Sequence, residues 1–257
     1  NIRLSGSQTV VRPELRELAF LNLYDFELNL SVQGDPTLKR TKITNLDLRY
    51  KLYPRAGEVF TLGVFYKNFN TPTEQFLNNT TVNFVNLTKA TAFGAEFEIR
   101  KKLDFSRPLK NFTFQSNISY IYSRAKDDVF QLDRPLQGQS PYVINMGILY
   151  DHQESGINAT LLFNRIGERI YLIGDVGIGA TSPDVYEAPR SVVDFQVAKK
   201  VLKTKGELRL NISDILNQTQ YFYQNANSKR SFQKNVDAYR FTRKFGTTFG
   251  LTFNYSL

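Results

Sequence analysis

The sequence contains an eight-residue stretch in which polar and apolar residues alternate strictly, Asn45-Leu46-Asp47-Leu48-Arg49-Tyr50-Lys51-Leu52. Successive side chains of a β-strand point to opposite faces, so the leucines and the tyrosine share one face and the polar residues share the other. The end of the chain repeats the pattern, with apolar side chains at every second position: Phe249, Leu251, Phe253, Tyr255 and Leu257. This period of two predicts strands with one apolar and one polar face.

The same alternation recurs along the chain and predicts about ten strands. It is clear at Phe93–Arg100 and Glu207–Ser213, and weaker at 1–10, 58–67, 111–124, 141–150, 156–166 and 190–201. Several stretches reach about ten residues, the length that a tilted strand needs to cross a bilayer. No run approaches the roughly 18 consecutive apolar residues of a membrane helix. A membrane crossing would therefore have to use strands.

The connections between these strands alternate between short and long. Short turns are expected at 53–57, 103–110, 151–156 and 202–206, and long polar connections at 11–41, 68–87, 125–140, 167–189 and 216–245. A β-sandwich also has alternating strands, but Greek-key connections give no reason for this regularity. An up-and-down barrel places all short turns at one end and all long loops at the other, as outer-membrane barrels do. No convincing amphipathic helix is present to cover the sheet, and lipid would serve instead.

Aromatic residues are predicted near both ends of the strands. Those near the short turns are Tyr50, Tyr53, Phe112, Phe114, Tyr150 and Tyr255, and those near the long loops are Tyr66, Tyr120, Tyr122 and Tyr142. Two such rows are typical of the interfacial girdles of membrane barrels, although aromatic residues also favour strands in general.

Composition excludes several classes of function. The net charge is +9, but lysine and arginine are scattered, which fits anionic headgroups or a barrel lumen better than specific nucleic-acid binding. The chain has no cysteine and a single histidine, His152, so it offers no thiolate or multi-histidine zinc site. A closed ten-strand outer-membrane protease would need acidic and histidine residues at the outer end of the barrel. His152 falls in a short turn, at the opposite end, which argues against this class. We predict no catalytic residue, cofactor or metal site.

Several segments together resemble the C-terminal half of TonB-dependent outer-membrane receptors of the Bacteroidetes type. The first matching segments are Ser7–Ala19, Tyr24-Asp25-Phe26, Gly34-Asp35-Pro36-Thr37-Leu38-Lys39 and the alternation at Asn45–Tyr50. The others are Phe65-Tyr66-Lys67, Gly94–Lys101, Leu136–Tyr142 and Asp214-Ile215-Leu216-Asn217-Gln218. The ending, Thr248-x-Gly250-x-x-Phe253-x-Tyr255, resembles the C-terminal signal of the bacterial barrel-assembly machinery.

The resemblance implies an all-β, antiparallel, up-and-down transmembrane barrel of which this chain supplies about ten of 22 strands. It also implies a plug domain, coupling to the TonB complex, and import of a scarce ligand into the periplasm. Residues 1–257 are then expected to be part of one barrel domain in the bacterial outer membrane, with the plug and the earlier strands absent. Two alternatives remain open: a complete ten-strand barrel, and a barrel scaffold for surface lipoproteins or secretion partners.

The expected partners are the lipid bilayer, lipopolysaccharide, the TonB complex through the plug and, in some relatives, a surface lipoprotein, but no nucleic acid. Mixtures of aromatic and amide side chains suit contact with sugars or peptides, because aromatic faces stack and amides hydrogen-bond. Such mixtures occur in two long connections. The predicted ligand contacts are Tyr171, Tyr186, Arg190, Tyr221, Tyr223 and Gln224. The alternative is that these residues only pack the loops and anchor the end of the barrel.

Overall fold

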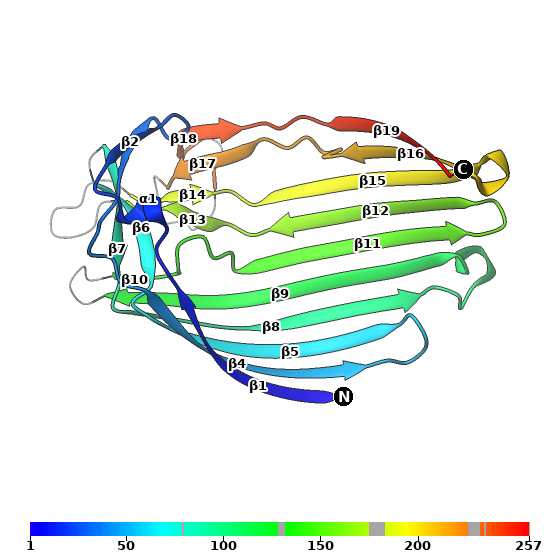
Figure 1. Cartoon of the computed structure of the whole chain (residues 1–257), viewed down its shortest axis with the longest axis horizontal. Helices are drawn as coiled ribbons and strands as arrows, with labels where there is room; N and C mark the ends of the chain where they lie inside the picture. Colours follow the sequence, from blue (N-terminus) through cyan, green and yellow to red (C-terminus); the bar gives the residue numbers. More distant parts are fainter. Residues whose placement is uncertain (79, 128–131, 175–182, 226–231, 234, 257) are drawn as a thin grey trace.

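The computed structural model describes residues 1–78, 80–127, 132–174, 183–225, 232–233 and 235–256. Ten long strands form one antiparallel sheet in which each strand pairs with the next along the chain (Figure 1). Across the sheet they are β1 (Ile2–Val11), β4 (Thr41–Leu52), β5 (Val59–Asn70), β8 (Lys89–Lys102), β9 (Phe112–Asp127), β11 (Tyr142–His152), β12 (Ile157–Ile166), β15 (Arg190–Val201), β16 (Gly206–Ser213) and β19 (Thr248–Tyr255). The short strand β10 (Leu132–Arg134) adds to β9. All ten predicted strands are confirmed.

The register of the sheet sorts its side chains into an apolar outer face and a polar inner face. Leu46, Tyr66, Phe93 and Tyr122 are direct neighbours across four strands and are all exposed on the outer face. On β9 the outer face runs from Tyr122 to Phe112, ten residues or about 34 Å of strand. At the usual barrel tilt of about 40° that length spans about 25 Å, the height of the apolar band of a membrane barrel.

The short turns lie together at one end of the sheet and the long connections at the other, as predicted (Figure 1). Within the described ranges, the helices are α1 (Leu15–Leu18) and two 3-10 turns, η1 (Arg107–Leu109) and η2 (Leu202–Thr204). No helix in this part of the chain has the length and apolar character needed to span a membrane. Strands β1 and β19 each pair on one side within the described residues, so the ten strands form an open wall.

The long connections contain regular structure that the sequence analysis did not predict. Eight short strands form two four-stranded sheets at the long-loop end, which we call the cap. One sheet has the order β2 (Asn22–Asp25), β3 (Leu30–Gln33), β7 (Thr81–Asn86) and β6 (Thr73–Asn78). The other has the order β13 (Arg169–Leu172), β14 (Val185–Glu187), β17 (Gln220–Gln224) and β18 (Ala238–Arg243).

The two cap sheets are joined and share one hydrophobic core. Phe76 and Ile173 form a parallel bridge, and the Leu77 amide donates to the Ile173 carbonyl at 2.8 Å. The shared core takes buried side chains from both sheets: Leu30, Leu77, Val82, Leu172, Val185 and Phe222. A smaller cluster of Leu87, Ala90 and Ala125 ties the cap to β8 and β9. Removal of this apolar surface from water holds the long connections together.

Candidate functional site

The inner face of the wall carries hollows at three levels, which together form a polar track from the cap to the short turns. A cavity of about 670 Å³ lies beneath the cap, one of about 450 Å³ lies near the middle of the strands, and one of about 540 Å³ lies at the short-turn end. This distribution follows from the alternation of the strands, because every second residue along a strand faces inward and most of these residues are polar.

The cavity beneath the cap combines charged, amide and aromatic groups. Its charged lining residues are Arg12, Glu17, Glu74 and Arg169, and its aromatic ones are Phe69, Phe84 and Tyr171. Gln75, Gln137 and Gln139 add amide groups. A cavity of this size and mixed chemistry suits a small organic ligand that needs both stacking and hydrogen bonds.

A buried ion pair fixes the wall of this cavity. The Arg134 guanidinium donates to the Glu74 carboxylate at 2.7 Å, and their side chains are only 12% and 3% exposed. The backbone amide of Gln137 donates to the other carboxylate oxygen of Glu74 at 2.8 Å. The side-chain amide of Gln137 donates to the Tyr171 carbonyl at 2.9 Å. These contacts join the connection after β10 to both cap sheets, so this side of the cavity is held by hydrogen bonds from both of them.

The middle cavity is lined by amides and charges of neighbouring strands. Asn164 on β12 donates to the Asn145 side chain on β11 at 2.6 Å. Glu98, Arg100 and Asp194 line the same cavity. Nearer the cap, the Arg49 guanidinium lies 3.5 Å from the Glu96 carboxylate. Such a surface can hydrogen-bond a passing solute or an inserted protein domain.

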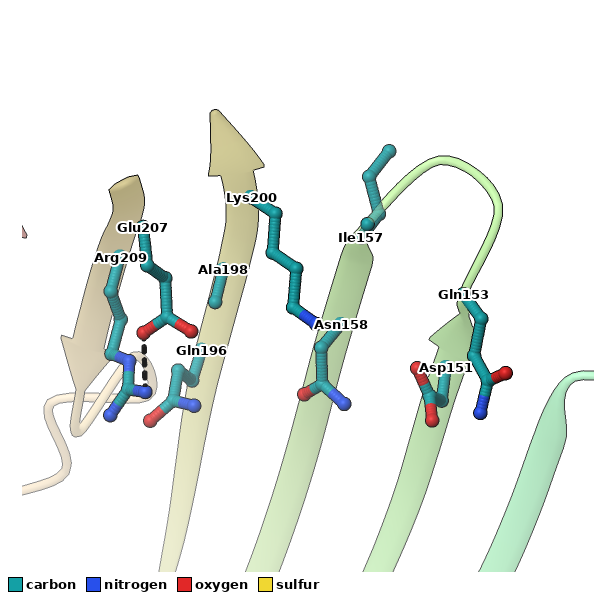
Figure 2. Close-up of a pocket in the computed structure, with 10 residues that line it drawn as sticks. Asp151, Gln153, Ile157, Asn158, Gln196, Ala198, Lys200, Glu207 and Arg209 are labelled. Atoms are coloured by element: carbon teal, nitrogen blue, oxygen red, sulfur yellow. Dashed lines mark hydrogen bonds and ion pairs between the residues drawn. The ribbon is translucent and has the colours of Figure 1, made fainter. Parts of the chain in front are cut away.

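The cavity at the short-turn end is lined by four adjacent elements (Figure 2). Glu207 and Arg209 of β16 form an ion pair at 2.6 Å, drawn as a dashed line. Lys200 of β15 extends toward Asn158 of β12, and further polar groups follow on the neighbouring strands. The inner face is therefore hydrophilic at this end as well as beneath the cap.

The structure brings five of the six predicted ligand contacts into one cap sheet. Tyr171 lies on β13, Tyr186 on β14, and the other three, Tyr221, Tyr223 and Gln224, on β17. The sixth, Arg190, begins β15 below them and forms an ion pair with Asp214, whose side chain is 10% exposed. The aromatic and amide residues singled out in the sequence thus lie mostly in one sheet, although the sequence could not show which face of that sheet each side chain occupies.

The aromatic residues divide between the two faces of that sheet. Tyr171 packs against Phe222 and Phe241, with ring centroids 4.6 and 5.8 Å away, on the side of the cap core. Tyr221 and Tyr223 point the other way and contact Phe232 at 5.1 and 4.8 Å. We call Tyr186, Tyr221, Tyr223, Phe232 and Tyr239 the tyrosine cluster.

Within the tyrosine cluster, Tyr223 has a structural role. It is fully buried, and its hydroxyl donates to the Glu168 carboxylate. Burial raises the pKa of Glu168, and burial together with this carboxylate raises the pKa of Tyr223. Tyr186 and Tyr221 are half-buried and Tyr239 is 44% exposed, so these three are the members that a ligand can reach.

Sequence reasoning missed β18 and its arginine. The Arg243 guanidinium lies 4.7 Å from the centre of the Phe222 ring and donates to Glu27 in the turn between β2 and β3. It thereby connects the two cap sheets at the edge opposite the Phe76 bridge. The alternation of Tyr239, Phe241 and Arg243 was the available signal, but it is too short to predict a strand.

The sequence profile of the outer membrane protein β-barrel family matches residues 1–255, nearly the whole chain. The chain belongs to this family. The member described here is therefore located in the outer membrane, with its apolar outer face toward lipid. Within the described residues, no group of three or more metal-binding side chains converges. No curated protein shows significant sequence similarity to it.

Solved structures show the same fold as this family member. The copper transporter OprC superposes with a TM-score of 0.67 at 15% identity, over 100% of this chain and 37% of that one. The ferric enterobactin receptor of Pseudomonas aeruginosa gives 0.63 at 15% identity, over 100% and 38%. The siderophore receptor PirA of Acinetobacter baumannii gives 0.57 at 15%, over 85% and 35%. The chain thus spans less than two fifths of each of these receptors.

Proposed function

We propose that residues 1–257 are the C-terminal part of the barrel of a TonB-dependent transporter that imports a scarce ligand into the periplasm. The observation that carries the proposal is the polar track on the inner face, which begins beneath a folded cap at the long-loop end. The superposition on parts of barrels named as siderophore receptors and a copper transporter supports it. The Bacteroidetes affiliation stays a prediction from the quoted motifs.

In this proposal the remaining strands and a plug domain complete the protein. Ten strands cannot close at the radius of a 22-strand barrel, and open edges are very unfavourable in lipid. The ion pairs and amides of the middle and short-turn cavities would then face the plug. The TonB complex would act on that plug, and this part of the barrel would supply a passive wall without catalysis.

The cap would capture the ligand. The tyrosine cluster offers three accessible aromatic side chains, Tyr186, Tyr221 and Tyr239. The cavity beneath the cap adds arginine and amide donors. Aromatic faces with amide and guanidinium donors suit an oligosaccharide, a peptide or an anionic metal chelate. The ligand is thus proposed to be a polar organic molecule with flat or ring-shaped parts.

A scaffold role is the second proposal, because the cap exposes large apolar side chains. Phe20, Leu21 and Phe26 are 72%, 61% and 88% exposed on the first long connection. Phe20 and Leu21 are consecutive, and a contiguous exposed apolar patch is a feature of surfaces that contact another protein. A surface lipoprotein that covers the barrel would bury these side chains, and so would neighbouring parts of the complete protein.

The test is ligand uptake by cells that express the full-length protein with Tyr221→Ala and Tyr239→Ala together. We expect uptake at low ligand concentration to fall about tenfold or more, as two stacking contacts of about 1 kcal/mol each are lost. Tyr53→Ala is the matched control, since Tyr53 is 60% exposed at the short-turn end. Deletion of 216–245 is a less selective test, because that segment contributes Phe222 to the cap core. Unchanged uptake with normal surface expression would exclude capture by the tyrosine cluster.

A further inference from the structure

Strand β2 forms one outer edge of the cap. It ends the order β2-β3-β7-β6, so within the described residues it pairs with β3 alone. The edge lies at the long-loop end of the wall (Figure 1). Large apolar side chains along it are exposed: Leu21, Leu23, Tyr24 and Phe26 at 61%, 49%, 52% and 88%. An unpaired strand edge presents a row of backbone donors and acceptors to which another strand can add.

The hydrogen bonds of β3 show which backbone groups of β2 face the open edge. The Ser31 amide donates to the Thr80 carbonyl at 3.2 Å, on the side of β7, so the backbone groups of Ser31 point away from β2. Tyr24 stands opposite Ser31 in the antiparallel pair, and its N–H and C=O therefore point away from β3. The same holds for Asn22, two residues earlier. Asn22 and Tyr24 thus direct their backbone groups to the open edge.

The two outer edges of the cap differ in how they are protected. Strand β18, at the other end, carries Arg240 and Arg243, and its register with β17 is irregular. Charged side chains and bulges keep strand edges from adding further strands. Strand β2 contains no lysine, arginine or proline, and its register with β3 is regular. Its one charged residue, Asp25, accepts hydrogen bonds from the amides of Glu27 and Leu28 in the following turn, both at 2.9 Å.

One face of the β2 edge continues the cap core. Leu23 stands opposite Val32, and Asp25 stands opposite Leu30. Leu30 is a buried member of the cap core, and Val32 packs against that core. Leu23 therefore lies on the core face of the sheet, yet its position at the edge leaves it 49% exposed. An added strand would place an apolar side chain beside Leu23 and extend the core.

We propose that β2 binds an extended peptide, which adds to the cap as an antiparallel strand. The inference rests on the proposed capture of a ligand by the cap, and it narrows that ligand to a peptide. A polypeptide backbone repeats donor and acceptor at the two-residue spacing of Asn22 and Tyr24, whereas sugars and metal chelates do not. The exposed edge comprises residues 20–26, about a third of the roughly 20–30 residues a side of a stable protein interface. A short peptide therefore fits this edge better than a folded partner.

The antiparallel arrangement determines which peptide amides matter. Peptide residues opposite Asn22 and Tyr24 exchange hydrogen bonds with them, and their side chains lie on the face away from the cap core. The intervening peptide residues direct their amides to solvent and their side chains toward Leu23. A peptide that alternates threonine with valine or leucine should therefore place its threonine amides against β2.

The probe is the acetylated peptide Thr-Val-Thr-Leu-Thr-Val with a fluorophore at its C-terminus. Fluorescence anisotropy follows its binding to the purified full-length protein in detergent. N-methylation of the two inner threonines should weaken binding about 25-fold, about fivefold for each lost donor. N-methylation of the first valine and the leucine should leave binding within about twofold, because those amides face solvent. The two methylated peptides test the contact without any change in the protein.

A variant of β2 tests the same contact from the protein side. Asn22→Pro removes an N–H that faces the open edge, a position where a strand tolerates proline, and should weaken binding of the unmethylated peptide about fivefold or more. Asn22→Ala is the matched control, since it keeps the amide and should bind like the wild type. Equal heat-dependent migration on a gel and unchanged hydrogen exchange of β3 and β7 show that barrel and cap are folded.

Three results would each overturn the site. They are the absence of saturable peptide binding, equal binding of the two methylated peptides, and equal binding by the proline and alanine variants. Failure of the proposed transport function has a different signature. Peptide binding with this methylation pattern but no uptake by cells would contradict transport and support the site. Ligand uptake that depends on the tyrosine cluster, with no peptide bound at β2, would overturn the site and leave transport standing.

Discussion

The cap should open as a unit, separately from the barrel wall, when its core is emptied at Phe222. This side chain is fully buried and lies 4.2 Å from Phe241 and 4.6 Å from Tyr171, measured between ring centroids. Truncation of a buried phenylalanine to alanine destabilises by about 3–5 kcal/mol, because apolar contacts are lost and a cavity remains. Arg243 also loses the ring beneath its guanidinium. We expect Phe222→Ala to lower the free energy of opening the cap by about 4 kcal/mol.

The measurement is hydrogen exchange of the full-length protein, followed by mass spectrometry of peptides. A loss of about 4 kcal/mol speeds exchange about a thousandfold in β13, β17 and β18, where protection reports cap opening. Peptides from β8 and β9 should exchange as in the wild type. Phe26→Ala is the matched control, since Phe26 lies in the cap but is 88% exposed. An increase below tenfold in the cap, or equal opening of the long strands, would refute an independent cap core.

Three other changes test particular contacts. Glu74→Gln should destabilise the cap by about 3 kcal/mol, because it leaves a buried arginine without its counter-charge, and proteolysis of the connection at 125–141 should report the loss. Glu58 has its pKa lowered to about 2, mainly by the hydrogen bond from Arg55, so its contribution to stability is complete above its ordinary pKa of 4.5 and is lost as the pH falls toward 2. Protection of the turn at 53–58, measured as the exchange rate relative to the intrinsic rate at each pH, should therefore fall within that window. Glu58→Gln should remove the part of this pH dependence that does not come from Asp104, whose pKa Arg55 also lowers. Gly94→Ala should impair folding of the barrel, since a β-carbon there would lie 2.3 Å from a backbone oxygen; normal yield and heat-dependent migration would contradict this.

The ten long strands and their two faces could be predicted from the sequence alone, because they depend on a local property. The alternation at Asn45–Leu52 fixes which side chains point to lipid, and each long strand pairs with its neighbour along the chain. The alternation of short and long connections then determines which end of the sheet carries the short turns and which carries the long loops. For the same reason the two aromatic rows could be assigned to the correct ends of the strands.

The cap was decided by the tertiary structure, because its residues are distant in sequence. The cap strands have three to six residues, too few for a visible period, and β3 pairs with β7 about fifty positions away. Burial of Tyr223 depends on Glu168 and Phe232, which no local pattern could assign to it. Local alternation determines a face, whereas contacts between distant segments depend on how the whole wall and its cap pack together.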